Sequence, residues 1–302
     1  MIRAEFEERS YEGPLYNQLE RGQRDIWSPG QVLESCVGFD HGLQLTRSVI
    51  WETLGYDAPL PGLALAYYDW LPFWGPRHPR RQLPRFKLNL FLQAKRPNFH
   101  KRKPRSLRST QTINAPLWAF RITRRQQRLL EVLARKTSRL AHVAYAAPTF
   151  HTLSELYCHT QRRTIVQNST FPSATALTGH DGWYYQRPGA SGTANPDPEL
   201  IEETELLPRL RAIARQSENA WGDGLEWLDA LAENVIEAVE LVGAAEAAAP
   251  VEALSALYFN DLHTLDRLSE IYNLRRTFKA YAQVMTFSIR FDLNWLVLTD
   301  SE

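Results

Sequence analysis

Residues 86–95 read Phe-Lys-Leu-Asn-Leu-Phe-Leu-Gln-Ala-Lys. Apolar residues fill almost every position from Leu88 to Leu92, which is typical of a strand buried on both faces. Gln93 and Lys95 follow, one residue apart. Because side chains alternate along a strand, these two lie on one face, whereas Ala94 points the other way into the core. The stretch therefore predicts a core strand that ends in two polar side chains directed at the same point.

The sequence on both sides of this strand predicts further helices and strands. Thr123 is expected to cap a helix that carries Leu129, Leu130 and Leu133 on its inner side. A buried strand that is closed by a proline follows this helix. The predicted helices are 11–22, 28–34, 124–136 and 153–160, and the predicted strands are 38–46, 86–95, 117–123, 140–148, 164–168 and 182–187. This order indicates a mixed α/β core.

The character of the chain changes after residues 188–198, a stretch rich in Gly, Pro, Ser and Asn that is typical of a surface loop or hinge. Helical patterns dominate beyond it, over 199–217, 225–249 and 251–282. Residues 284–299 alternate apolar and polar side chains, which leaves open a final strand. We therefore expect an α/β domain over residues 1–190 and an acidic, mainly helical region over 199–302.

Charge is segregated along the 302 residues, although the formal net charge is only +1. Residues 70–130 contain sixteen Lys or Arg and no Asp or Glu, whereas residues 199–270 contain sixteen acidic residues and four Arg. Such asymmetry indicates an anionic partner for one surface. The acidic helices over 199–282 are expected to bind a second copy or a partner protein. Two ordinary solvated faces are the alternative.

Other features of the composition narrow the class of protein. The two cysteines, Cys36 and Cys158, show no metal-site spacing, which is typical of a reduced, cytoplasmic protein. The charged N-terminus does not resemble a signal peptide, and no apolar run is long enough to cross a membrane. No HExxH, GxSxG or GxxxxGK[ST] motif is present. His151 and Glu155, four residues apart, form either a second polar cluster or a helix start.

Hydrolysis of a phosphodiester needs a divalent metal, an activated water and a group that neutralises developing charge. Mg²⁺ takes oxygen ligands, usually one or two carboxylates together with waters. Asp40, at the start of a predicted strand, is the best first ligand, and Glu34 is expected to face the same point. Gln93 offers a carbonyl oxygen and Lys95 an ammonium group. Glu12, or else Glu20, is expected to support the site from the first helix.

The residues Glu34, Gly38-Phe-Asp40 and Phe91-Leu-Gln93-Ala-Lys95 resemble the PD-(D/E)xK restriction-endonuclease-like nuclease superfamily. The Gln-x-Lys variant is similar to nuclease effectors of bacterial anti-phage defence systems. The resemblance covers roughly residues 11–150. It implies a restriction-endonuclease-like mixed sheet flanked by helices, with metal on Asp40, Gln93 and Glu34 and with Lys95 as a catalytic residue. The chain departs from the pattern in the long gap from Asp40 to Gln93 and in Gln93 itself, which stands where an acid is commoner.

A basic loop follows the strand and is expected to track a phosphate backbone. Phe73, Trp74 and Phe99 lie among the cations, either as stacking platforms for bases or as ordinary packing residues. The residues expected to bind nucleic acid are Arg96, Lys101, Arg102, Lys103, Arg105 and Arg108.

Three functions remain open at this point. The first is a Mg²⁺- or Mn²⁺-dependent endonuclease that acts on DNA in the cytoplasm, in the setting of bacterial defence. The second is a non-catalytic nucleic-acid-binding protein with a nuclease-like fold. The third is a scaffold whose acidic helices bind a basic partner. For each residue taken alone, a structural role is the simpler interpretation. Asp40 would cap a turn, Glu34 would be a solvated helix residue and Lys95 would begin the cationic loop.

Overall fold

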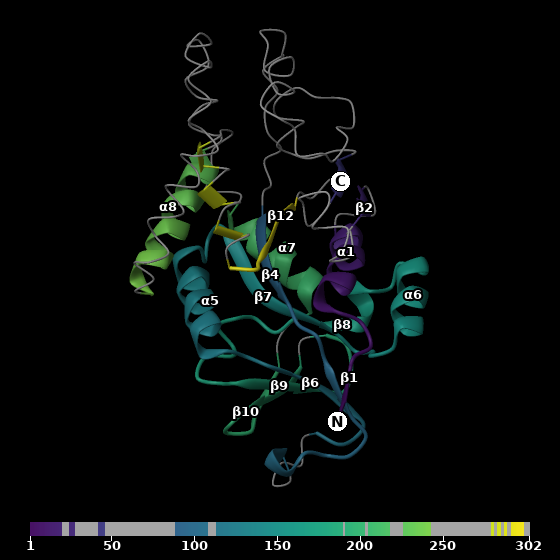
Figure 1. Ribbon diagram of the computed structural model, residues 1–302. Coiled ribbons are helices and arrows are strands. Elements are labelled where there is room, and N and C mark those ends of the chain that lie inside the picture. The colour runs from purple at the N-terminus through teal and green to yellow at the C-terminus, as the bar shows by residue number, and fades with distance from the viewer. Residues whose placement is uncertain are drawn as a thin grey trace.

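The computed structural model describes a mixed α/β protein (Figure 1). The described residues are 1–19, 24–27, 42–45, 88–107, 113–189, 191–202, 205–217, 226–242, 279–280, 283–284, 287–288 and 291–298. The predicted helix 28–34 lies outside these residues. The predicted α/β class is confirmed. No helix among the described residues is both long enough and apolar enough to cross a membrane.

The first sheet is built around β4 (Leu88–Ala94), the predicted core strand. β4 pairs in parallel with β7 (Ala141–Pro148) and antiparallel with β12 (Asn294–Leu298), and β8 (Ser169–Thr170) follows β7 at the far edge. Every residue of β7 is buried. Both strands are covered on their two faces, which explains why their sequences are apolar runs rather than alternating patterns.

Two helices cover one face of this sheet, as Figure 1 shows beside β4 and β7. α5 (Arg124–Lys136) has the predicted bounds, and Leu129, Leu130 and Leu133 are buried as predicted. α8 (Glu226–Leu241) packs beside it. Thr123 occupies the predicted N-cap position in an extended conformation, but its side chain makes no capping hydrogen bond.

Three other helices cover the opposite face. They are α1 (Glu8–Leu19), α6 (Leu153–Gln161) and α7 (Leu206–Ser217). Apolar residues of these helices pack with Leu90, Leu92 and Ala94 of β4 in a second core cluster. Alternation along β4 thus divides its side chains between two cores. Both cores include residues from beyond position 199, among them Trp227 and Leu206.

A second, antiparallel sheet packs against the first core cluster and lies below it in Figure 1. Its strand order is β1-β5-β6-β9-β10-β11. Phe120, Trp183 and Tyr185 of its middle strands are fully or almost fully buried. The bounds are β1 Ile2–Arg3, β5 Asn98–His100, β6 Leu117–Arg121, β9 Gly182–Tyr185, β10 Gly192–Asn195 and β11 Glu199–Ile201.

The sequence interpretation was wrong in five segments. The basic loop contains β5 and a short 3₁₀ turn, Arg105–Leu107. The predicted strand 164–168 is mostly a 3₁₀ turn, Val166–Asn168. The predicted loop 188–198 contains β10, and the predicted helix 199–217 begins as β11. The described residues from 283 to 288 are helical, and the final strand starts only at Asn294. Pairing with other strands decides β5, β10 and β11, and local propensity does not record it.

A separate hairpin joins β2 (Arg24–Trp27) to β3 (Gly42–Leu45). β3 falls within the strand predicted over 38–46 and begins two residues after Asp40. Asp40 and Glu34 themselves lie outside the described residues.

Close packing makes Gly192 a sensitive position. A Cβ atom there would lie 2.5 Å from Trp183 Cζ2 and 2.6 Å from the Tyr184 carbonyl oxygen. We expect Gly192→Ala to lower the free energy of unfolding by roughly 1–3 kcal/mol, because overpacking a core costs about this much. Urea titration followed by circular dichroism measures the change.

Gly182 provides the matched control. A Cβ atom at Gly182 meets nothing closer than 3.6 Å, an ordinary contact. Gly182→Ala should therefore change the free energy of unfolding by at most about 1 kcal/mol. Equal stabilities of the two variants would contradict the register given for β9 and β10.

Candidate active site at the carboxyl end of β4

Polar side chains gather where β4 ends. Gln93 is 1% exposed, and Lys95 comes directly after the strand. One side chain of α5 contacts both: the Lys95 Nζ donates to Gln126 Oε1 at 2.8 Å, and Gln126 Nε2 donates to Gln93 Oε1. Ala94 is fully buried in the core on the other face. Gln93 and Lys95 therefore share a face, as the alternation predicts.

An acidic residue from the far end of the chain joins this group. Gln93 Nε2 donates to Asp292 Oδ2 at 3.4 Å. Asp292 lies in the turn before β12, and the pairing of β12 with β4 brings it there. Its φ of 53° is in the left-handed region, which costs free energy for a non-glycine residue and is common at functional sites.

Two further carboxylates come from α1. Glu8 Oε1 accepts from the backbone N–H of Arg96 at 3.0 Å, which places Glu8 beside the end of β4. Glu12 lies one turn further along the helix and is only 4% exposed. Burial, followed by the negative charges of Asp292 and Glu8, raises the pKa of Glu12 to about 7, although Lys95 and Arg9 oppose the shift. Glu12 is thus a buried acid within electrostatic range of both Asp292 and Lys95.

Lys95 is held in a partly apolar environment. Its Nζ lies 5.8 Å from the centroid of the Tyr145 ring, within the range of a cation–π interaction. Burial lowers the pKa of Lys95, and the negative charges of Glu8, Asp292 and Glu12 oppose that shift. The ammonium group is thereby easier to deprotonate than an exposed lysine, while three acids nearby favour its charged form.

The position of this cluster within the sheet is favourable for a binding site. β4 and β7 are parallel, so their carboxyl ends meet at one edge of the sheet. Ligands of open α/β sheets bind outside the carboxyl ends of the strands. We therefore name the group made of Glu8, Glu12, Gln93, Lys95, Gln126 and Asp292 the β4 cluster.

The β4 cluster contains some of the predicted site residues and adds others. Gln93, Lys95 and the predicted supporting residue Glu12 belong to it, whereas Asp40 and Glu34 stay predictions outside the described residues. Gln93 offers its amide nitrogen to Asp292, and its oxygen is engaged by Gln126. Sequence reasoning missed Glu8, Gln126 and Asp292. The only feature of the local sequence that could have indicated one of them is the position of Gln126 on the helix that begins within the acid-free segment 70–130.

The basic residues expected to bind nucleic acid have different surroundings. The Arg96 guanidinium donates to the Ala4 carbonyl oxygen and forms a 2.6 Å ion pair with Glu7, so it ties the N-terminal segment to the sheet. Lys101, Arg102 and Arg105 are exposed, and Lys103 is half-buried. Arg108 lies outside the described residues. Arg96 therefore makes contacts within the protein, whereas three cations of the basic loop are open to solvent.

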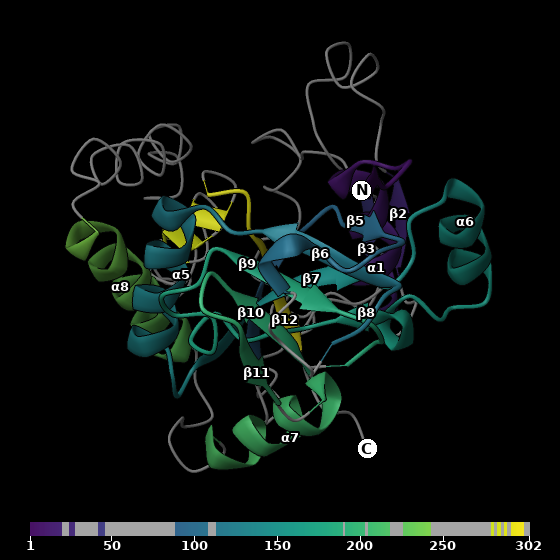
Figure 2. The same cartoon turned by 90° about the horizontal axis from the view of Figure 1, so that it is seen from below.

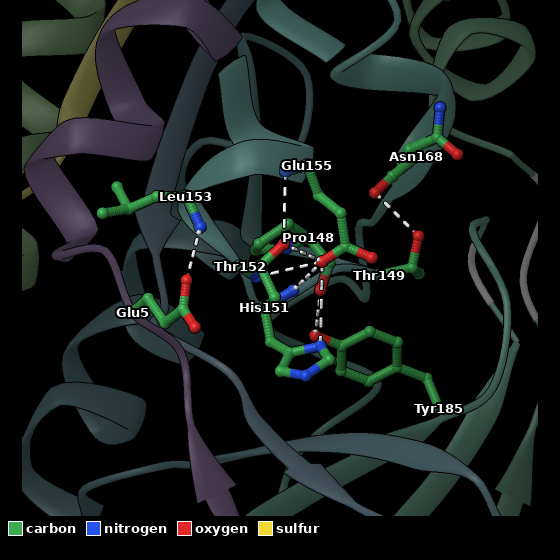
Figure 3. Close-up of polar contacts among 9 residues, drawn as sticks. All are labelled: Glu5, Pro148, Thr149, His151, Thr152, Leu153, Glu155, Asn168 and Tyr185. Carbon is green, nitrogen blue, oxygen red and sulfur yellow. Dashed lines mark hydrogen bonds and ion pairs between the residues drawn. The ribbon is translucent and has the colours of Figure 1, made fainter. Parts of the chain in front are cut away.

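His151 and Glu155 form the start of α6 (Figure 3). Thr152 and Glu155 make a reciprocal capping box, and Glu155 Oε2 also accepts from the backbone N–H of His151 at 3.0 Å. The His151 ring stacks on Phe99 at a centroid distance of 4.2 Å. Phe99, one of the predicted stacking platforms, is thus engaged within the protein. These contacts explain the pair as a helix cap.

The donor set of the β4 cluster suits a hard cation. Its carboxylates supply the oxygen atoms that Mg²⁺ and Mn²⁺ prefer, and burial is the largest cause of the raised pKa of Glu12. Within the described ranges, no three His, Cys, Asp or Glu side chains are close enough to hold a metal ion together. A divalent ion at this place would therefore have at most one or two of the described carboxylates as ligands and would keep several waters.

Comparison with known proteins adds no relative: no protein-family model, no curated protein and no solved structure matches this chain.

Glu12 should make stability depend on pH. Its carboxyl binds a proton more tightly in the folded chain, with a pKa of about 7, than in the unfolded chain, where 4.5 is the ordinary value. The resulting stabilisation is complete below about pH 4.5 and is lost as the pH rises through 7. We expect Glu12→Gln to be more stable than the wild type at pH 8, by on the order of 3 kcal/mol, and equally stable near pH 4.5.

Urea unfolding in EDTA at several pH values from 4.5 to 8 measures this difference. Glu233→Gln, at an exposed position of α8, is the control and should follow the wild type at every pH. A Glu12→Gln curve that runs parallel to the wild-type curve would show that the Glu12 carboxyl is ionised normally.

Proposed function

We propose that this protein is a metal-dependent endonuclease that hydrolyses phosphodiester bonds in DNA. The observation that carries the proposal is the β4 cluster: a half-buried lysine at the carboxyl end of a core strand, within electrostatic range of the carboxylates of Glu8, Asp292 and Glu12. An ammonium group among acids at a sheet edge provides two of the requirements of phosphoryl chemistry, charge neutralisation and oxygen ligands.

Five of the six residues of the cluster have a role in this proposal. Asp292 and Glu12 hold Mg²⁺ or Mn²⁺, together with Asp40 and Glu34 if the resemblance to the PD-(D/E)xK superfamily holds. When bound, the metal supplies Lewis-acid activation of the phosphate and of water. Lys95 stabilises negative charge that develops on the phosphate, and Gln126 fixes its ammonium group through the 2.8 Å hydrogen bond. Gln93 orients Asp292.

The surroundings of the cluster favour a polyanionic substrate. Arg124, Arg125 and Arg128 are exposed on the first turns of α5, the helix that carries Gln126. They belong to the acid-free segment 70–130. A concentration of positive charge beside a reactive group raises the local concentration of an anionic substrate and speeds its association.

The biological setting follows from the resemblance alone. Nuclease effectors with a Gln-x-Lys motif point to bacterial defence against phage DNA in the cytoplasm. The acidic region 199–282 is proposed to contact a second copy or a partner subunit, since Glu233 and other acids of α8 are exposed.

A non-catalytic nucleic-acid-binding protein is the second candidate. The oxygen of Gln93 is occupied by Gln126, and the described residues contain no group of three close metal-ligating side chains. Both observations favour a fold that has kept its basic surface without cutting. The two candidates differ in whether a metal changes the DNA.

Cleavage assays separate the candidates. Supercoiled plasmid and a single-stranded oligonucleotide are incubated with purified protein in Mg²⁺, Mn²⁺ or EDTA. We expect nicking only with metal, and we expect Lys95→Ala and Asp292→Asn each to reduce the rate by roughly 100-fold or more. DNA affinity measured in EDTA should change little, because neither side chain belongs to the exposed basic surface.

Lys136→Ala serves as the lysine control, since Lys136 pairs with Glu237 between α5 and α8 and lies outside the β4 cluster. It should cut like the wild type. Metal-dependent cutting that survives in Lys95→Ala would remove Lys95 from the mechanism. Absence of cutting by the wild type in every metal, together with retained DNA binding, would favour the second candidate.

A further inference from the structure

Four neighbouring strands of the second sheet contain no acidic residue. They are β1, β5, β6 and β9, and all of their charged residues are cations. Figure 2 views the molecule from the side on which this sheet lies. The strands come from three separate parts of the chain, so the absence of acids is a property of the assembled surface.

Strand register separates the two faces of this sheet. Phe99, Trp118 and Tyr185 are cross-strand partners, and Tyr185 is completely buried. This row therefore faces the core. The next row, which points the other way, runs across the sheet through Arg3, Asn98, Ala119, Tyr184, Thr193 and Leu200.

Tyr184 is the aromatic centre of the outer face. It is half-buried and packs against Leu107, Ile113 and Leu117, a small cluster that anchors the loop after β5. The ring of His100 lies 6.4 Å from the Tyr184 ring, tilted by 54°. Burial, and then the nearby amino terminus, lower the pKa of His100, so its ring is neutral at pH 7. Two uncharged rings thus stand side by side on this face.

Exposed cations lie on the same face and in the adjoining loop. Lys101 and Arg102 follow His100 directly, and Arg105 lies in the same loop, which Leu107 ties to the sheet. Arg3 and Arg121 are also exposed and point to this face by register. Because each of these side chains is exposed, it can contact a phosphate without giving up a buried contact.

We propose that this outer face binds single-stranded nucleic acid, with a base stacked on Tyr184 and the sugar–phosphate backbone along Lys101, Arg102 and Arg105. Stacking on an aromatic ring requires a base with a free face, which a single strand offers and an intact duplex does not. The rings can stack on the bases of such a strand, and the cations can contact its phosphates.

This inference rests on the proposed function in one respect: it identifies the bound strand as the substrate of the β4 cluster. The chain itself links the two places, because His100 is five residues from Lys95, at most about 18 Å along an extended chain. That span is a few nucleotides long. A strand held on the outer face would therefore reach the end of β4.

Fluorescence anisotropy in EDTA tests binding without cutting. The probes are a 20-nucleotide oligo(dT), the corresponding oligo(U) and a 20-base-pair duplex. We expect the wild type to bind both single strands more tightly than the duplex. Tyr184→Ala should weaken binding of the single strands roughly 5-fold to 100-fold, the range for loss of one stacked base. Tyr184→Leu keeps apolar packing against Leu117 and should lose affinity similarly, which separates stacking from folding.

The control for Tyr184 is Tyr157→Ala, since Tyr157 is 65% exposed on α6. The double variant Lys101→Ala/Arg102→Ala should reduce the slope of log affinity against log salt by about 0.7 for each lost phosphate contact. Arg162→Ala/Arg211→Ala, exposed at the C-cap of α6 and on α7, should leave that slope unchanged.

Two results would overturn the inference: tighter binding of the duplex than of either single strand, or wild-type affinity in the folded Tyr184→Leu variant. Because these measurements exclude metal, they do not depend on cleavage. If the protein binds single strands through Tyr184 but never cuts them, the proposed nuclease function is wrong, whereas the proposed binding surface still holds.

Discussion

The pairing of β4 with two distant strands determines the rest of the structure. β7 lies parallel to it on one side, and β12, about two hundred residues away in sequence, lies antiparallel on the other. Apolar side chains on both faces of β4 belong to two separate cores, so the strand is fixed on all sides. The side chains at its carboxyl end therefore lie on a strand that is paired on both edges and packed on both faces.

This constraint makes a charged cluster possible at the sheet edge. Glu12 is buried, Lys95 is half-buried and Asp292 is exposed, and elements that pack for other reasons keep the three within electrostatic range of one another. α1 delivers Glu8 and Glu12, the turn before β12 delivers Asp292, and α5 delivers Gln126. Asp292 adopts a left-handed backbone conformation in that turn. Backbone strain of this kind is found at functional sites, and aspartate adopts this region more readily than most residues.

Local sequence patterns predicted the regular elements of the first sheet well. The periodicity of residues 124–136 and the apolar run 141–148 each reflect burial that is fixed within one segment. The shared face of Gln93 and Lys95 follows from strand geometry alone. Asp292 could not be predicted from the sequence, because only the pairing of distant strands places it beside Gln93. Arg96 was read from its charge, although its partners Ala4 and Glu7 decide what it does. The second sheet was underpredicted because its short strands depend on neighbours distant in sequence.

The central claim is that the carboxylates beside Lys95 hold a divalent metal ion. Anomalous diffraction from crystals soaked in Mn²⁺ tests it most directly. We predict an anomalous peak within about 2.0–2.3 Å of a carboxylate oxygen of Asp292 or Glu12, on the same side of β4 as Lys95. Well-diffracting soaked crystals with both carboxylates ordered and no peak near either would contradict it.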